Sequence, residues 1–240
     1  AALAEAMQRH PALNNSRIVP VVLTQGTVRS TATDAVIPRV TVLGIDDGIA
    51  NLYKARLHLA ERQVAVNRAL AHDLDLAAGD TLLLALDRSG AVSPDVLFAH
   101  RDRERTTLML RAQVSAILPD AGLGGFSLGA NTALPRNLFI DRDWLLAQLG
   151  KSGKANALLI DSKASDTVLA NALHASCTLA DYGLKLVPDP QAPRVTVQSD
   201  SMVLSDTIVD TAKRVLADTC WVSPTSAYLA TTIRNARNGR

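Results

Sequence analysis

The clearest pattern in the chain is a regular alternation of apolar and polar residues over positions 106–118. Leu108, Leu110, Ala112 and Val114 fall on one side of this stretch, and mostly polar residues fall between them. Successive side chains of a strand point to opposite faces, so an alternation with a period of two indicates one buried and one exposed face. We therefore expect a long, half-exposed antiparallel strand here.

A compact strand–helix–strand unit is predicted for residues 63–86. It opens with a valine-rich strand, after which Asn67 has a side chain suited to cap a helix by accepting from its first free amides. Apolar residues at helical spacing follow over positions 68–74. The pair Gly79-Asp80 is a strong turn signal ahead of a run of leucines, which predicts the second strand.

The remaining elements differ between the middle and the ends of the chain. Strands are predicted at 17–29, 36–45, 138–140, 157–160, 184–187, 194–197 and 227–233, and helices at 1–13, 48–53, 141–149, 165–181 and 206–217. The last third therefore runs β-α-β-β-α-β, which is the order of a split βαβ unit. We predict an α+β fold in which a split β-α-β-β-α-β subdomain, residues 1–45 plus 155–240, carries an inserted, mainly β subdomain at 46–154.

Composition narrows the class of protein. The chain has 240 residues, of which 48% are hydrophobic and 20% charged, with a formal net charge of +2. Only 3% are aromatic, and no broad basic face is visible, so nucleic-acid binding is not expected. No apolar run approaches the roughly 18 residues of a membrane-spanning helix, and no signal peptide is visible. Because the chain opens inside a helical pattern, we expect it to be a piece of a longer protein.

One motif is typical of serine hydrolases. The residues GFSLG at 125–129 match the G-x-S-x-G nucleophile elbow, which needs a strand directly before the serine and a helix directly after it. Here Pro119 and several glycines precede Ser127, and Pro135 follows. His174 alone among the histidines comes after the serine, as the elbow requires, and it lies within a predicted amphipathic helix. A glycine-rich surface loop is the better interpretation.

Paired carboxylates offer little support for metal binding or catalysis. Asp46-Asp47 and the pair of Asp73 with Asp75 lie at predicted turns or helix ends, where aspartate commonly caps a helix or forms a turn. Calcium would need more oxygen donors at close spacing, and the histidines are dispersed. The sequence therefore predicts no catalytic, cofactor-binding or metal site.

The two cysteines, Cys177 and Cys220, leave two interpretations open. They fit no zinc spacing, and they lie far apart in the sequence. Either both are small buried side chains, or they form one disulfide in an oxidising compartment.

Three stretches of the chain carry a family resemblance. The first spans residues 64–84, with Asn67 and Gly79-Asp80, and the last spans 224–233. The second and longest comprises residues 123–128, 131, 135–140, 144–145, 148–149 and 155–159. Together they resemble the extracytoplasmic (MacB-type periplasmic core) domain of FtsX-like ABC transporter permeases. The resemblance covers nearly the whole chain and is weakest at 87–105.

The resemblance implies a fold and a role. The split α+β part would be porter-like, and the inserted β-rich part would be sabre-like. The family has no catalytic residues in this domain and no cofactor there, because a separate cytoplasmic subunit or domain hydrolyses ATP. The domain would transmit conformational change, and it would contact a substrate or periplasmic partner during ATP-driven export or mechanotransmission.

The same resemblance implies location and partners. The chain would be a periplasmic domain of an inner-membrane (cell-membrane) protein, set between the first and second membrane helices of the permease. Those helices would link it to the cytoplasmic ATPase, and a periplasmic partner or lipoprotein substrate would contact it. Two alternatives remain: a free-standing periplasmic binding or adaptor domain, and a serine hydrolase using Ser127.

Within a transporter domain, a loop is the best candidate for a contact surface. Exposed glycine-rich loops on a rigid scaffold often carry recognition, and residues 122–135 form such a stretch, although it is equally suited to be a simple connector. The candidate contact residues are Gly124, Gly125, Phe126, Ser127 and Leu128.

Overall fold

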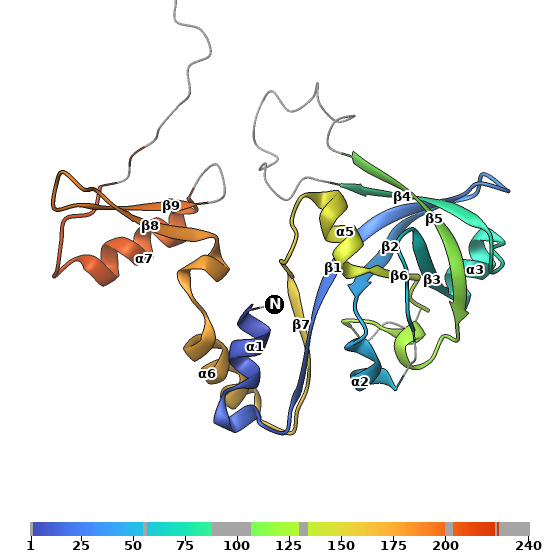
Figure 1. Ribbon diagram of the computed structural model, residues 1–240, viewed down its shortest axis with the longest axis horizontal. Coiled ribbons are helices and arrows are strands. Elements are labelled where there is room, and N and C mark those ends of the chain that lie inside the picture. Colours follow the sequence, from blue (N-terminus) through green and yellow to red (C-terminus); the bar gives the residue numbers. More distant parts are fainter. Residues whose placement is uncertain are drawn as a thin grey trace, which may run out of the picture. The chain divides into compact units, whose positions relative to one another are not determined.

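The computed structural model describes residues 2–54, 57–87, 107–129, 134–199, 204–223 and 225 (Figure 1). The chain divides into two compact units, Ala1–Asp181 and Tyr182–Arg240. The described residues form a mixed α+β fold, as the sequence predicts. None of their helices is long and apolar enough to cross a membrane.

A closed barrel forms the centre of the first unit (Figure 1). Its strands are β1 (Arg17–Ser30), β2 (Val36–Ile45), β3 (Gln63–Asn67), β4 (Thr81–Asp87), β5 (Thr107–Leu118) and β6 (Asn137–Asp141). They follow the order β1-β2-β6-β3-β5-β4, and β1 closes the ring by pairing with both β2 and β4. The pairs β2–β6 and β3–β5 are parallel, and the other pairs in the ring are antiparallel.

The barrel interior follows from the alternation along β5. Leu108, Leu110, Ala112 and Val114 are buried in the main core, whereas Met109 is 57% exposed, so the predicted half-exposed strand is confirmed. Strand β3 has no such alternation, and its last four residues are all buried. It lies between β5 and β6 and therefore has no free edge, and its two faces contact different apolar clusters.

Three short helices complete the barrel. Helices α3 (Arg68–Leu74) and α5 (Arg142–Leu149) bury apolar side chains in the main core. Helix α2 (Ile49–Tyr53) belongs to a second cluster, formed by barrel side chains such as Phe139 and Leu43 and by Phe126 from the segment before β6. The barrel is thus packed on its inner surface and on part of its outer surface.

A separate base packs around the first residues of β1. There β1 pairs with β7 (Ala157–Asp161), and the two strands run side by side from the barrel towards the helices (Figure 1). Helix α1 (Ala2–Gln8), the 3-10 turn η1 (Pro11–Leu13) and helix α6 (Asp166–Ser176) enclose a small cluster in which Met7, Leu13 and Ala172 are buried. Strand β1 therefore belongs to both the base and the barrel.

Helix α6 is shorter than predicted. It ends at Ser176, whereas the sequence pattern suggests a helix to about residue 181. Cys177 is extended, and both the backbone N–H and the hydroxyl of Thr178 donate to the Asp181 carboxylate at 2.8 Å. This local pairing competes with helix geometry, and a short 3-10 turn, η4 (Leu179–Tyr182), takes the place of the last helical turns.

The second unit contains a hairpin and a helix. Strands β8 (Leu184–Pro188) and β9 (Val195–Ser199) pair antiparallel, and α7 spans Asp206–Leu216. In the hairpin turn, hydrogen bonds from the Gln191 backbone N–H and the Arg194 side chain lower the pKa of Asp189.

The element order of the predicted split unit is present from β7 to α7, and the predicted strand at 227–233 lies outside the described residues. Strands β2 and β6 pair across the predicted subdomain boundary at residue 45. The division into subdomains stays a prediction.

Candidate contact site

The glycine segment, residues 119–129, folds back onto the barrel instead of extending from it. After β5 the chain forms the 3-10 turn η3 (Gly122–Gly125), and Leu123 and Phe126 insert into the outer apolar cluster with only 3% and 6% of their surfaces exposed. A Cβ atom on Gly124 would overlap the Pro119 carbonyl oxygen. Glycine is therefore required at this position, because two parts of the backbone approach closely.

Asn137 holds the glycine segment from the first position of β6. Its side-chain amide donates to the carbonyl oxygens of Gly124 and Phe126, at 3.0 and 2.8 Å. Asn137 is fully buried, and its Oδ1 atom is the one buried side-chain oxygen or nitrogen in the described chain without a hydrogen-bond partner. The segment is thus fixed by hydrogen bonds from Asn137 to its backbone carbonyls.

Asn67 connects the same region to the start of α3. Its Oδ1 atom accepts from the backbone N–H groups of Leu70 and Asn137, at 3.2 and 3.0 Å, and its Nδ2 donates to the Pro135 carbonyl at 2.6 Å. The predicted helix cap is confirmed. The sequence did not reveal that this residue also joins β6 and the segment before it.

The Gly79-Asp80 turn is fixed in a similar way. Gly79 has a φ of +99° and donates its N–H to the Val114 carbonyl at 2.7 Å. The Asp80 carboxylate accepts from the Ala77 N–H, and its carbonyl accepts from the Val114 N–H, both at 2.8 Å. The turn therefore joins the end of α3 to the middle of β5.

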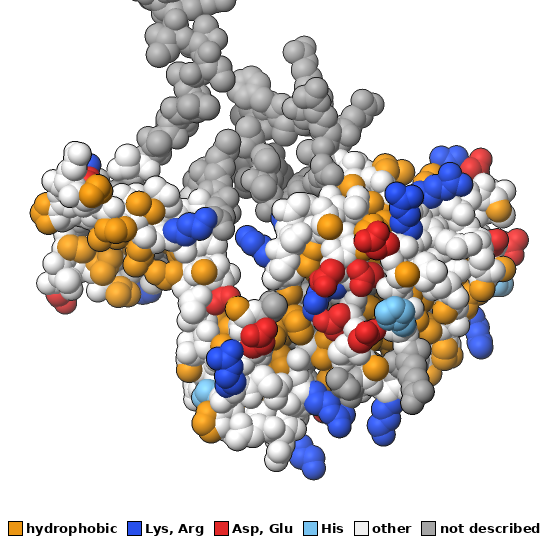
Figure 2. All heavy atoms as spheres, in the orientation of Figure 1, with side chains coloured by type: hydrophobic (Ala, Val, Ile, Leu, Met, Phe, Trp, Pro, Cys, Tyr) orange, Lys and Arg blue, Asp and Glu red, His pale blue; other side chains and the backbone are white. Residues whose placement is uncertain are grey.

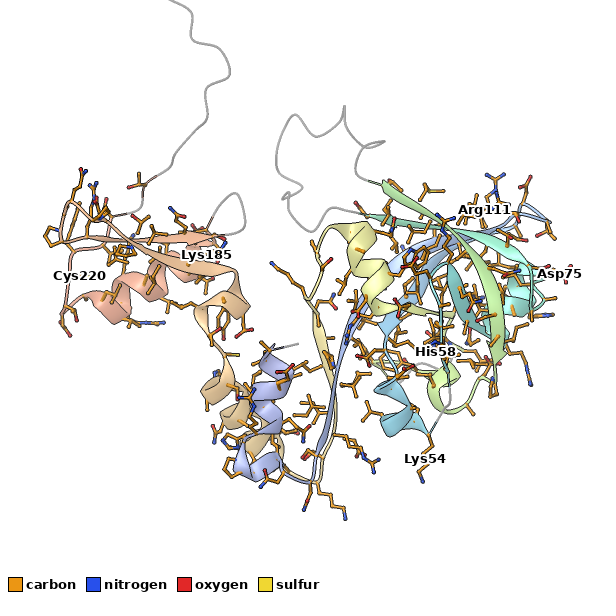
Figure 3. All side chains as sticks on the ribbon, viewed as in Figure 1. Lys54, His58, Asp75, Arg111, Lys185 and Cys220 are labelled. Carbon is orange, nitrogen blue, oxygen red and sulfur yellow. The ribbon has the colours of Figure 1, made fainter. Side chains whose placement is uncertain are left out.

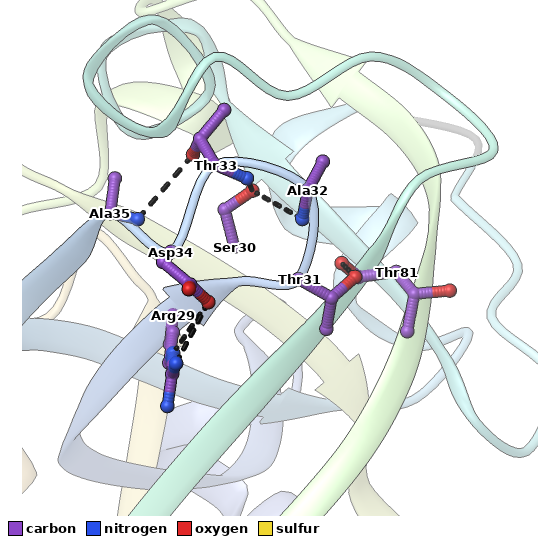
Figure 4. A network of polar contacts seen from close by, with 8 residues as sticks. All are labelled: Arg29, Ser30, Thr31, Ala32, Thr33, Asp34, Ala35 and Thr81. Atoms are coloured by element: carbon purple, nitrogen blue, oxygen red, sulfur yellow. Dashed lines mark hydrogen bonds and ion pairs between the residues drawn. The ribbon is translucent and has the colours of Figure 1, made fainter.

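The hairpin between β1 and β2 carries its own polar network (Figure 4). Ser30 is fully buried, and its hydroxyl accepts from two amides of the turn at 3.4 Å. Thr31 donates from its hydroxyl to the Thr81 carbonyl at 2.7 Å, which joins the turn to β4. Arg29 pairs with Asp34 at 2.7 Å, so the tip of this hairpin is held by side chains.

The five candidate contact residues do not share one environment. Gly124 and Phe126 are buried and Gly125 is half-buried, so the expectation of an exposed loop is wrong for this part. Ser127 is exposed, and Leu128 has 74% of its surface exposed. Contact through this segment stays a prediction, now restricted to its exposed end.

The neighbourhood of Ser127 differs from a nucleophile elbow. A 3-10 turn precedes the serine where the elbow needs a strand. Its hydroxyl donates to the Gly129 carbonyl at 2.8 Å, within a local turn. In the part of the chain that the structure describes, the hydroxyl is therefore not placed on a strand-to-helix turn.

Acidic side chains gather near the centre of the face seen in Figure 2, with a histidine beside them. His58 lies 3.2 Å from Asp47, and both are largely exposed. Asp73 pairs with Arg136 at 2.5 Å, and Asp75 ends α3 in the left-handed conformation. His58 lies in the loop before β3, whereas Asp75 directly follows α3 (Figure 3). No group of three His, Cys, Asp or Glu residues within the described ranges is placed to hold a metal ion.

Cys177 and Cys220 belong to different units. Cys177 directly follows α6 and is half-buried, whereas Cys220 follows α7 and is exposed (Figure 3). Their pairing in a disulfide stays a prediction.

Comparison with known proteins finds a likeness among solved structures. No protein-family model matches the chain, and no curated protein matches it. Among solved structures, the periplasmic region of MacB from Actinobacillus actinomycetemcomitans is similar, with a TM-score of 0.43 and 10% sequence identity. The alignment covers 91% of this chain and 83% of that one. A likeness at this level does not assign the chain to a family.

Proposed function

We propose that this chain is the extracytoplasmic domain of an FtsX-like, MacB-type ABC transporter permease, without catalytic activity of its own. The sequence resemblance carries the proposal, and the fold supports it in one respect. Asn67, Gly79, Asp80 and Asn137, all within the resembling stretches, fix the barrel turns and the glycine segment. The stretches that resemble the permeases therefore contain residues on which this fold depends.

The proposed role is to pass conformational change between the membrane and a partner. Strand β1 suits this role, because one continuous strand pairs with β7 in the base and with β2 and β4 in the barrel. In this proposal ATP is hydrolysed by a separate subunit or domain, and the chain itself holds no cofactor. Its partners are the membrane helices of the same permease and a periplasmic protein or lipoprotein substrate.

The encoding gene provides the first test. We expect one hydrophobic helix on the N-terminal side of this chain and three on the C-terminal side. Soluble sequence on both sides would overturn the assignment to a permease and favour a free-standing binding domain.

Cys220 provides a direct test of location. In the full-length protein, with every other cysteine replaced by serine, a membrane-impermeant maleimide should label the exposed Cys220 in intact cells whose outer membrane has been permeabilised. A Cys220→Ser variant is the control and should stay unlabelled. Labelling that requires lysis of the inner membrane would place the domain in the cytoplasm and refute the proposal.

The predicted disulfide can be tested in the same cells. With Cys177 retained, a disulfide to Cys220 would block labelling until a reductant is added. Labelling of both thiols without reductant would rule the disulfide out. This outcome would not change the conclusion about where the domain is located.

A further inference from the structure

Strand β1 changes partners within a few residues. Its residues 17–21 pair with β7 on one edge, and pairing with β4 on a barrel edge begins only at Gly26. Pairing with β2 begins at Val22. We name residues 20–23 the β1 junction, because here one strand connects two differently packed bodies, the base and the barrel. On each edge of the junction, some backbone groups of β1 lie beyond the end of the neighbouring strand.

Asn156 fills the gap on the β7 side. The backbone N–H of Asn156 donates to the Val21 carbonyl, which shows that odd-numbered residues of β1 point their polar backbone groups to this side. The pairing of β1 with β7 ends at Val21, and at Leu23 the Asn156 side chain makes the hydrogen bonds that a strand backbone would make. Its Oδ1 accepts from the Leu23 N–H at 2.8 Å, and its Nδ2 donates to the Leu23 carbonyl at 2.7 Å. One amide side chain thus extends the β7 ladder by one residue.

Arg142 fills the gap on the opposite side. Pro20 has no N–H, and its carbonyl points away from β7, towards the edge where β2 has already ended at Ile45. The guanidinium of Arg142, at the start of α5, donates to this carbonyl at 3.1 Å. The same Nη1 atom donates to Asp46, the residue after β2, at 2.5 Å.

The ion pair at this junction is better shielded than most of the ion pairs among the described residues. The side chains of Arg142 and Asp46 are 15% and 32% exposed, whereas most other described pairs expose about half or more of at least one partner. Asp46 is itself oriented by the Gly48 N–H at 2.9 Å. A shielded pair is weakened less by salt than an exposed one.

We propose that Arg142 and Asn156 stiffen the β1 junction, one from each edge, so that the base and the barrel move together as one rigid body. The inference deepens the proposed function, since a stiff junction is what would carry motion between membrane and partner. Without the two side chains, the carbonyls of Pro20 and Leu23 and the N–H of Leu23 lose these hydrogen bonds at the β1 junction. The strand would then flex there.

Spin labels on each body test the proposal in the purified chain. Glu5→Cys on α1 and Arg68→Cys on α3 provide two exposed positions, in a background in which Cys177 and Cys220 are serine. Pulsed electron paramagnetic resonance then gives the distance distribution between base and barrel. Arg142→Met and Asn156→Ala should each widen this distribution, and the double variant should widen it further.

A matched control separates the junction from general loosening. Arg136 forms an ion pair of the same length with Asp73, but within the barrel, so Arg136→Met should leave the distribution unchanged. In parallel, the Leu23 amide should exchange its hydrogen about tenfold faster in Asn156→Ala. If Arg142→Met does not fold, Asn156→Ala still decides.

Two outcomes overturn the inference: a double variant that keeps the wild-type distribution, or equal widening by Arg136→Met. The measurement needs neither membrane nor ATPase, so its failure would leave the transporter assignment open. Conversely, if the labelling experiment placed the domain in the cytoplasm, the inference about the β1 junction would still stand.

Discussion

Replacing Asn67 by alanine should cost far more than the loss of a helix cap. Removal of a capping side chain typically costs about 1 kcal/mol. Here the same oxygen also accepts from the buried N–H of Asn137, and a buried donor left without a partner costs about 1–3 kcal/mol. We therefore expect Asn67→Ala to lower the free energy of unfolding of the barrel by about 3 kcal/mol. For a unit of this size, that corresponds to a fall in Tm of roughly 6–12 °C.

Urea unfolding followed by tryptophan fluorescence measures this effect. Trp144 is 9% exposed and reports on the barrel, while Trp221 is 87% exposed and is best replaced by phenylalanine. Asp141→Ala is the matched control. The Asp141 carboxylate caps α5 by accepting from the Trp144 N–H at 2.7 Å, and within the described residues it is not seen to bond to a second segment. If Asn67→Ala costs no more than Asp141→Ala, the claim that Asn67 links α3 to β6 is refuted.

Three further predictions concern single positions. Gly124→Ala should destabilise the barrel by about 1–3 kcal/mol in the same urea assay, because the added Cβ would overlap the backbone. The control Gly129→Ala should be neutral, because its added Cβ meets nothing within 4 Å. Equal effects of the two variants would contradict this reasoning. Arg39→Gly should raise the free energy of unfolding by up to about 1 kcal/mol, because Arg39 has a strained φ of +58° in β2. A lower free energy of unfolding would argue against backbone strain at Arg39. The pKa of Asp189 is lowered on folding, so its carboxylate stabilises the β8–β9 turn above the ordinary aspartate pKa. This stabilisation is lost as the pH falls through the lower folded value. NMR of the turn amides should show the loss, and Asp189→Asn should abolish the pH dependence.

Local features of this fold could be predicted from the sequence. The half-buried strand β5, the Asn67 cap and the Gly79-Asp80 turn each depend on neighbouring residues, and the structure confirms all three. Helix α5 also ends at Leu149 as predicted, and Gly150 follows it with a φ of +67°. In each case residue type and spacing alone fix the local geometry.

Long-range pairing could not be predicted in this way. Nothing in the pattern of β1 indicates that its two halves belong to different bodies, or that β2 and β6 pair in parallel to close the barrel. Asn137 and Asn156 look like ordinary polar residues at strand starts, because their partners are backbone groups that carry no residue signature. Phe126 lies in a glycine-rich stretch without periodicity, so its burial had no sequence signal.

The pairing of β1 has a consequence for how the chain is made. Asn156 and Leu23 are 133 positions apart, so during synthesis β1 leaves the ribosome long before β7 exists to cover its edge. Until then the emerging chain presents an uncovered strand edge, which is a template for pairing with other chains. Slow elongation through residues 24–156 would prolong that exposure, and a chaperone that shields extended segments would shorten it.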